Sequence, residues 1–573
     1  MTEYTIPRPE YPNPQFERTD WLNLNGEWQF EIDQSASGRE RELFKADSFS
    51  QKITVPFCPE SELSGIGFKD FISAVWYRRT VDIPAEKLGG RVFLHFGAVD
   101  YEAFVYVNGT LVGSHKGGYI HFSFDITGFV RAGENVITVC AEDDSRSPLI
   151  PSGKQSFLHY SKGCHYTRTT GIWQTVWLEF TPKSYIRSLR IFPDYKAGTA
   201  DLQVQVVGKG TLKAEAFFDG KPVGTLEREA DGDLVCATLA LSETHVWDLG
   251  EGNLYDLRLT FGEDTVKSYF GLRNVRMDGW KFMLNDRSVF MRLVLDQGFY
   301  PDGIYTAKSE DELVRDIELS LAAGFNGARL HEKIFEPRFL YHCDRMGYIV
   351  WGEYPNWGID YSDPRALAAV LPEWMEELER DFNHPAIIGW CPFNETWDYQ
   401  GRRQWDELLR VVYRTTKAID PTRPCIDTSG NFHVETDIFD VHDYEQKVEI
   451  FKKNYDRLMT ENDLEDRHHN HDGSQIWKGE ATFVSEYGGI RWAGADAAGW
   501  GYGEAPQTEQ AFKDRYKGLT DALLDNDKMC GFCYTQLYDV EQELNGLYTY
   551  GRVPKFDMDF FKSVNSRKAA IED

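Results

Sequence analysis

Hydrophobic and polar residues alternate over short stretches in the first third of the chain. Residues 91–96 and 102–107 follow this pattern, with an apolar side chain at every second position. Alternation of this period predicts strands with one buried face. Asn108 and Gly109, directly after the second stretch, form a pair typical of tight hairpin turns. Many short strands between turn signals predict a jelly-roll β-sandwich over residues 1–183.

A second alternating region follows at residues 184–272. Residues 202–206 and 255–259 again place an apolar side chain at every second position. The region shows no helical period, and its length of about 90 residues fits a small immunoglobulin-like β-sandwich. We therefore predict a second β domain there.

The pattern changes again in residues 273–573. Eight short apolar runs now alternate with longer segments that have the period of an amphipathic helix. One such segment opens at Ser309, with Glu312 three residues later as in a capping box, and continues with Leu313 and Ile317 on one face. Strands that alternate with helices over about 300 residues predict a (β/α)8 TIM barrel. In that fold the active site gathers at the carboxyl ends of the strands.

Two glutamates stand at such strand ends. Glu395 follows the fourth apolar run, and Glu486 closes the seventh. Two carboxyl groups that face one pocket are what glycosidic bond cleavage needs, because one donates a proton to the leaving oxygen while the other, ionised, attacks the sugar. Position alone leaves a second interpretation equally open, since a chain with 91 acidic residues places many of them in loops by chance.

Charge and composition narrow the range of partners. The chain has 62 Lys and Arg against 91 Asp and Glu, a net charge of −29, which argues against nucleic acid or an anionic membrane surface as a partner. No apolar stretch approaches the ~20 residues that span a bilayer, and the first residues lack the apolar core of a signal peptide. Nine cysteines without scaffold spacing fit reduced thiols, so we expect a cytoplasmic protein.

Two clusters suggest other chemistry. Cys530 and Cys533 have the spacing of a redox pair, but they lie inside an apolar run that predicts a buried strand. His468, His469 and His471 look like a metal site, yet their spacing matches no familiar ligand pattern, so we predict a solvated loop. We expect neither a metal nor a cofactor.

Several motifs resemble those of glycoside hydrolase family 2, which includes β-galactosidases, β-glucuronidases and β-mannosidases. Asn394 and Glu395 are similar to the acid/base segment of that family, and Ser-Glu-Tyr-Gly at 485–488 is similar to its nucleophile segment. Further matches occur, in the family's order, at residues 21–28, 171–179, 324–331 and 343–353. The resemblance implies a jelly roll, an immunoglobulin-like sandwich and a barrel, in agreement with the domains predicted from the pattern.

The resemblance also implies roles for single residues. It assigns Glu395 as general acid/base and Glu486 as nucleophile, with retention of the anomeric configuration. Asn394 would bind the hydroxyl beside the anomeric carbon. Tyr444 would orient the nucleophile, with a packed aromatic ring as the alternative. Arg329 would support the nucleophile electrostatically or form a structural ion pair.

Other strand-end residues are candidate sugar ligands. They are Asp296, His331, Glu353, Trp492 and Tyr534. Asp296 stands where large β-galactosidases of the family end the first strand in Asn-Arg-His, and Tyr534 lies near the position of a tryptophan that forms the floor of the sugar site. Trp492 belongs to the glycine-rich segment 488–503, which we interpret as a wall for the leaving group or as a subunit contact in a homo-oligomer.

One position bears on the substrate. β-Glucuronidases of the family have an Asn-x-Lys pair for the substrate carboxylate, and the local match, at Asn545, has Leu547 in place of the lysine. The sequence therefore predicts an exo-acting β-galactosidase that hydrolyses small glycosides. The alternatives are a β-glucuronidase or β-galacturonidase in which Arg168 replaces the missing lysine, an α-L-arabinosidase, and a non-catalytic carbohydrate-binding protein.

Overall fold

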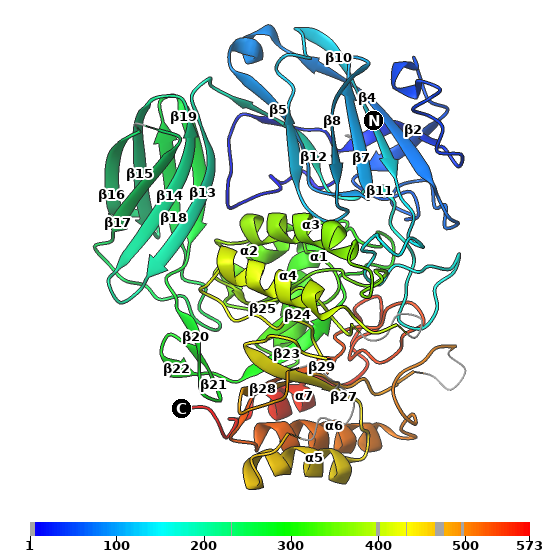
Figure 1. The fold of residues 1–573 in the computed structure, drawn as a ribbon, viewed down its shortest axis with the longest axis vertical. Coiled ribbons are helices and arrows are strands. Elements are labelled where there is room, and N and C mark those ends of the chain that lie inside the picture. The colour runs from blue at the N-terminus through cyan, green and yellow to red at the C-terminus, as the bar shows by residue number, and fades with distance from the viewer. Residues whose placement is uncertain (1–5, 231, 397–401, 431, 465–474, 494–497) are drawn as a thin grey trace.

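The protein is built from three units that follow one another along the chain (Figure 1). The computed structural model describes residues 6–230, 232–396, 402–430, 432–464, 475–493 and 498–573. The first β domain lies against the barrel, and a smaller β-sandwich lies beside both. His468, His469 and His471 lie outside the described residues.

The first unit is a sandwich of two antiparallel sheets. One sheet has the order β1-β12-β5-β9, and the other has the order β3-β2-β4-β10-β7-β8. The strands are β1 (Trp21–Asn23), β2 (Gly26–Ile32), β3 (Gln51–Val55), β4 (Ala74–Ile83), β5 (Arg91–Phe96), β7 (Glu102–Val107), β8 (Thr110–Lys116), β9 (Phe122–Asp125), β10 (Gly133–Glu142) and β12 (Val176–Thr181). Trp28, Leu94 and Val105 are among the side chains buried in its core. The alternation of apolar positions thus predicted this sandwich.

Shorter elements complete the first unit. Two short strands, β6 (Val99–Asp100) and β11 (Gly171–Ile172), pair antiparallel with each other. Two 3₁₀ turns, η1 (Leu43–Lys45) and η2 (Ala85–Gly89), lie between the longer strands.

The second unit has one sheet of three strands and one of four, all antiparallel. The orders are β13-β14-β17 and β16-β15-β18-β19. The strands are β13 (Tyr185–Asp194), β14 (Thr199–Val207), β15 (Gly210–Phe218), β16 (Lys221–Ala230), β17 (Leu234–Ala240), β18 (Tyr255–Phe261) and β19 (Asp264–Phe270). In β14 the residues Leu202 and Val204 are buried while Gln203 is exposed, because neighbouring side chains of a strand point to opposite faces.

The third unit contains a parallel sheet of seven strands in the order β26-β25-β24-β23-β29-β28-β27. The strands are β23 (Met291–Asp296), β24 (Gly327–Leu330), β25 (Ile349–Glu353), β26 (Ile387–Cys391), β27 (Ile438–Asp443), β28 (Ala481–Gly488) and β29 (Met529–Thr535). The segment at residues 424–429 lies between the two edges of this sheet. Ile426 N donates to Trp390 O of β26 at 2.9 Å, and Asp437 N, just before β27, donates to Cys425 O at 3.0 Å. The predicted TIM barrel is confirmed.

Helices cover the outside of the barrel sheet (Figure 1). They are α1 (Glu310–Ala322), α2 (Pro337–Met346), α3 (Ala366–Arg380), α4 (Asp406–Ile419), α5 (Val448–Thr460), α6 (Glu509–Leu524) and α7 (Met558–Asn565). A small sheet of β20 (Val275–Asp278), β21 (Lys281–Leu284) and β22 (Arg287–Ser288) precedes the first barrel strand. At the start of α1 the Glu312 carboxylate accepts from Lys308 N at 3.1 Å, one residue earlier than in the predicted capping box.

The cysteine pair lies within strand β29, as the sequence predicted. Cys530 and Cys533 are both buried, and all nine cysteines of the chain are free thiols. Burial raises the pKa of both thiols, so neither is poised as a thiolate. In the part of the chain that the structure describes, no helix has the length and apolar character needed to cross a membrane.

A loop of the first domain reaches over the barrel and is anchored there by its backbone. Ser152 N donates to Trp357 O at 2.8 Å, and Gly153 N donates to Pro355 O at 3.2 Å. Gly153 has a φ of 53°, and a Cβ at this position would lie 2.4 Å from the carbonyl oxygen of Glu332. Only glycine permits so close an approach. The segment that begins here therefore forms part of the barrel mouth.

Candidate active site

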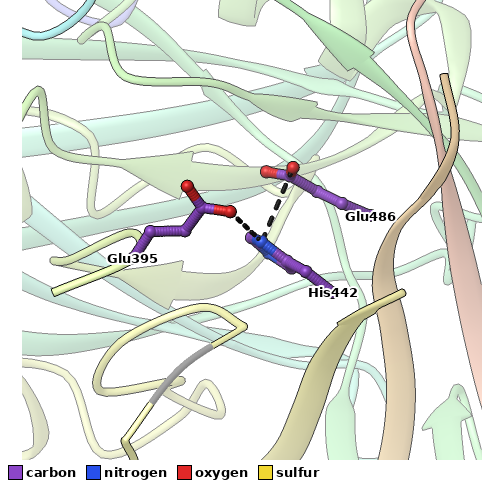
Figure 2. A group of neighbouring side chains, drawn as sticks. All are labelled: Glu395, His442 and Glu486. Carbon is purple, nitrogen blue, oxygen red and sulfur yellow. Dashed lines mark hydrogen bonds and ion pairs between the residues drawn. The ribbon is translucent and has the colours of Figure 1, made fainter. Parts of the chain in front are cut away.

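The two glutamates meet at the carboxyl end of the barrel sheet. Glu486 lies in β28, and Glu395 lies shortly after the end of β26. One carboxylate oxygen of each lies within 4.8 Å of the other. A separation of about 5–5.5 Å between the carboxyl groups is typical of glycosidases that retain configuration. Figure 2 shows the two carboxyl groups converging on His442, which lies between them.

Glu486 is buried and surrounded by hydrogen-bond donors. Arg329 Nη1 donates to its Oε1 at 3.2 Å, and the hydroxyl of Tyr444 donates to its Oε2. Burial by itself favours the neutral carboxyl, but the positive charges of His442 and Arg329 outweigh it and lower the pKa of Glu486 to about 2. The carboxylate is therefore ionised at neutral pH.

The side chain of Arg329 is held in place by Glu353. Its Nε donates to one oxygen of Glu353, and His331 Nδ1 shares a hydrogen bond of 3.1 Å with the other. Burial holds the pKa of His331 well below its usual value, so the neutral ring can donate from Nδ1. Arg329 thus contacts the nucleophile and also forms a structural ion pair, which combines the two predicted alternatives. Both carboxylate oxygens of Glu353 are bound, one to Arg329 and one to His331.

His442 is the main site residue that the sequence analysis missed. Its Nδ1 lies 2.6 Å from Glu395 Oε1 and 3.5 Å from Glu486 Oε2, and its Nε2 lies 3.0 Å from Ser429 Oγ. Burial disfavours the charged ring, but the two carboxylates raise the pKa of His442 above its usual value. The imidazolium can therefore donate to Glu395. A Cβ at Gly430 would lie 2.2 Å from the ring of His442, so only glycine lets the backbone come this close to the ring.

A sequence signal for His442 did exist. Tyr444 was predicted to face the nucleophile, and residues two apart in a strand point to the same face. The ladder between β27 and β28 also shifts at Ser485, so that His442 pairs with Glu486. This bulge could not be read from the pattern of apolar residues.

Three ligand atoms, from Glu395, His442 and Glu486, are close enough together to hold a metal ion. The geometry also works without one, because His442 Nδ1 lies at hydrogen-bond distance from Glu395. We therefore interpret the cluster as a network that shares protons.

Asn394 keeps a donor available for a ligand. Its Oδ1 accepts from Arg329 Nη2 at 3.3 Å, while its Nδ2 is buried and has no partner among the described residues. Asn356 Nδ2 and Trp357 Nε1 both donate to its backbone oxygen, at 2.9 and 3.1 Å. A buried amide without a partner is costly unless a ligand satisfies it. The orientation suits the predicted contact with a sugar hydroxyl.

Asp296 lies buried at the end of β23. Its Oδ1 accepts from Gly298 N at 2.9 Å and from the hydroxyl of Tyr538. Burial, together with the charge of Asp316, raises the pKa of Asp296 to about 6. Its role as a sugar ligand stays a prediction.

Two predicted sugar ligands pack against helix α6. The ring of Tyr534 packs against Tyr516 of α6 at 4.9 Å between centroids, on the helix side of the sheet. The next residue, Thr535, faces the site instead, with its Oγ1 3.1 Å from the hydroxyl of Tyr444. The ring of Trp492 packs against Phe512 of α6 at 5.8 Å. The prediction that Tyr534 forms the floor of the sugar site therefore does not hold, while a substrate contact of the partly buried Trp492 stays a prediction.

The segment at 488–503 contacts its own chain. Tyr502 stacks on Tyr444 with 3.4 Å between ring centroids, and Trp500 Nε1 donates to Gly163 O of the first domain at 2.7 Å. Residues 494–497 lie outside the described part of the chain. The segment thus joins the first domain to the tyrosine beside the nucleophile, and its roles as a wall for the leaving group or a subunit contact stay predictions.

Arg168, the predicted substitute for the missing lysine, binds backbone oxygens of the protein itself. Arg168 donates to the backbone oxygens of Lys69, Ser156 and Leu158. Leu547 is completely buried in the core. Arg168 is therefore not available to a substrate.

A cavity of about 1450 Å³ lies away from the glutamates. It is lined by residues of the first domain, the second sandwich and α3, among them His121, Trp177, Arg190 and Met375. Neither Glu395 nor Glu486 contributes to its wall. We place the active site by the convergence of the two carboxyl groups, because that is where the arrangement can perform chemistry.

Two family models match the chain. The sugar-binding domain of glycosyl hydrolases family 2 matches residues 22–182, and the TIM barrel domain of the same family matches residues 275–495. The chain belongs to glycosyl hydrolase family 2. The first domain and the barrel of this family 2 member therefore correspond to the family's two described domains, in the predicted order.

Individual relatives and solved structures that resemble the chain are named β-glucuronidases. The chain is 27% identical over 476 residues to a β-glucuronidase of Canis lupus familiaris, covering 74% of this chain and 71% of that protein. It is 25% identical over 449 residues to a β-glucuronidase of Paenibacillus borealis, covering 70% and 72%. The structure of a Ruminococcus gnavus β-glucuronidase in complex with D-glucuronic acid superposes with a TM-score of 0.78 at 19% identity, covering 97% of this chain and 99% of that one. At that identity the structural likeness shows the fold.

These comparisons correct the predicted substrate. The sequence analysis favoured a β-galactosidase because Leu547 stands where a lysine was expected. The similar proteins are instead named β-glucuronidases. The prediction of a β-galactosidase was wrong, because neither the missing lysine at Leu547 nor the net charge of −29 excludes an acidic sugar as substrate.

Proposed function

We propose that the protein is a retaining exo-β-glucuronidase, which removes terminal β-linked glucuronic acid from small glycosides. The observation that carries this proposal is the unequal pair at the barrel mouth, in which Glu486 is ionised and Glu395 lies within 4.8 Å of it. The sugar specificity is supported by the β-glucuronidases that the chain resembles.

The chemistry would proceed in two displacements. Glu486 attacks the anomeric carbon while Glu395 donates a proton to the leaving oxygen, which gives a covalent glycosyl-enzyme. Glu395 then takes a proton from water, which attacks the same carbon and releases the sugar with its original configuration. The unpartnered Nδ2 of Asn394 would donate to the hydroxyl beside the anomeric carbon. A non-catalytic carbohydrate-binding protein would not need two converging carboxyl groups.

A substrate comparison tests this function. We expect kcat/KM for 4-nitrophenyl β-D-glucuronide to exceed the values for the matching β-D-galactoside, β-D-glucoside and α-L-arabinoside by at least about 100-fold, since an ionised substrate group bound by a cation contributes roughly 3 kcal/mol. Including the β-D-galacturonide in the set tests the configuration at C4. Proton NMR of the first sugar released should show the β anomer. A preference for a neutral glycoside would overturn the proposal.

A further inference from the structure

Lys154 is a buried cation without a protein partner. Its residue is only 5% exposed. Within the described ranges, no hydrogen bond is recorded for its Nζ and no carboxylate oxygen lies within 4.0 Å of it; its one recorded contact is with the ring of Trp357, 3.7 Å from the centroid. Lys333, which is 4% exposed, donates by contrast to the backbone oxygens of Gly298 and Tyr305.

The position of Lys154 is fixed by the backbone contacts of the loop that carries it. The preceding residue, Gly153, is tied to the barrel through Pro355 and Trp357. Trp357 in turn donates from Nε1 to the carbonyl oxygen of Asn394 at 3.1 Å. The ammonium group of Lys154 therefore lies over the ring of Trp357, and this ring binds Asn394, the residue directly before Glu395.

The acidic groups around Lys154 have other partners. Glu543 accepts from the hydroxyl of Tyr166 at 2.5 Å and from Asn545 at 3.0 Å. Glu486 is bound by Arg329 and Tyr444, as described above. These carboxylates act on Lys154 only from a distance.

Protonation differs between the groups that face Lys154. Burial raises the pKa of Glu332 well above its usual value, because the charged carboxylate is unfavourable away from water. Burial by itself disfavours the charged form of Lys154, but Cys164, Glu332, Glu486 and Glu543 together raise its pKa above the usual value. The ammonium stays charged.

A charge that is largely removed from water and has no partner of opposite charge is unfavourable, and a ligand that supplies the opposite charge relieves this cost. We propose that Lys154 binds the carboxylate of the uronic acid ring and so replaces the lysine that is missing at Leu547. This inference rests on the proposed β-glucuronidase function. It assigns the choice between an acidic and a neutral sugar to the first domain, while the bond-breaking groups belong to the barrel.

Two substrates and three variants test this inference. 4-Nitrophenyl β-D-glucuronide and β-D-glucoside share their ring stereochemistry, and only the first has a carboxylate. We expect Lys154→Met to lower kcat/KM for the glucuronide about 100-fold, mainly through a higher KM, and to change the value for the glucoside less than about 3-fold. Lys154→Arg should restore part of the loss. Lys162→Met removes an exposed lysine of the same loop and should leave both values within about 2-fold.

The outcomes separate the two proposals. If the wild type prefers the glucuronide but Lys154→Met loses equally on both substrates, Lys154 only positions Trp357 and the inference is wrong while the function stands. If the wild type does not prefer the glucuronide, the function is wrong, and titration calorimetry with D-glucuronate and D-glucose then decides. Glucuronate binding that depends on Lys154 would uphold the inference, and glucuronate binding no tighter than glucose would overturn it. Circular dichroism of each variant verifies its fold.

Discussion

Glu486 and Glu395 have the same side chain in very different surroundings. Glu486 lies within strand β28, 4% exposed, with Arg329 and Tyr444 bound to its two oxygens. Glu395 lies in a loop with a backbone φ of 48°, and among the described residues its carboxyl group has one hydrogen-bond partner, His442. Among the described residues, two donors bind the Glu486 carboxylate and one binds that of Glu395.

The difference matches what two roles would require. A nucleophile must stay ionised and aimed at one atom, so many rigid donors help it. An acid that later becomes a base must gain and lose a proton, and a large set of donors would hold it in the ionised form. The barrel meets both needs because strand residues such as Glu486 have fixed directions, while Glu395 lies beyond the end of β26 and has His442 as its one side-chain partner among the described residues.

The most severe test of this contrast is Glu486→Ala. Because it removes the attacking group, we expect kcat to fall by about 10⁴-fold or more on every substrate, whatever the leaving group. Steady-state assays with aryl glucuronides of different leaving-group pKa measure this. Glu318→Ala, an exposed glutamate on α1, is the control and should behave as wild type. Near-normal turnover without Glu486 would refute the mechanism.

Glu395→Ala should have a smaller and more selective effect. We expect a loss of about 10²–10⁴-fold for alkyl glucuronides, which need a proton on the leaving oxygen, and a clearly smaller loss for 4-nitrophenyl glucuronide. Added azide should restore part of the activity, because it attacks the glycosyl-enzyme without a general base. An equal loss on all substrates, with no response to azide, would mean that the roles of the two glutamates are reversed.

His442 should make stability depend on pH in a defined direction. Its pKa is raised on folding, so its stabilising contribution is complete below the unfolded value of about 6.5 and is lost as the pH rises through the folded pKa. The difference in Tm between wild type and His442→Asn should therefore be largest below pH ~6.5 and shrink in alkaline buffer. Glu486 has the opposite sign, since its contribution is lost as the pH falls from about 4.3 toward 2.

Thermal melts of both proteins across this pH range measure the effect, with His159→Asn, an exposed histidine, as the control. A difference in Tm that grows with pH would contradict the cationic state of His442.

The smallest effect is expected at Tyr534. Its hydroxyl is buried without a partner among the described residues, so Tyr534→Phe should leave kcat/KM within about 2-fold and keep or slightly raise Tm. Tyr487→Phe is the matched comparison on the same side of the sheet. It loses a hydrogen bond of 2.8 Å to Thr520 and should lower stability by about 1 kcal/mol. A large loss of activity in Tyr534→Phe would return this residue to the sugar site.

Much of the architecture could be predicted from local pattern. Alternation in the β domains and apolar runs in the barrel reflect which side chains are buried, so three units and their order followed from the sequence. The two glutamates were found because barrel strands end at the active site. Burial patterns and strand ends are properties of short segments, so they can be predicted from a single sequence.

The errors concern single positions whose direction depends on register or on docking. Tyr534 and Thr535 are neighbours, and a shift of one residue exchanges which of them faces the site. Lys154 comes from another domain, and nothing in its local sequence indicates that Gly153 brings it to the barrel. The substrate prediction failed for a related reason, because one missing lysine at Leu547 says nothing about cations elsewhere in the chain.

The hydrogen bond from Gly153 N to Pro355 O has a consequence for folding during synthesis. Both β domains are complete on the ribosome before Pro355 has been synthesised, so the loop that begins at Ser152 emerges without the surface that orders it. The first domain can reach its own fold early, but this loop has to wait for the barrel. A chain that stops before Pro355 would therefore contain a folded first sandwich whose loop from Ser152 onward lacks the barrel residues that bind it.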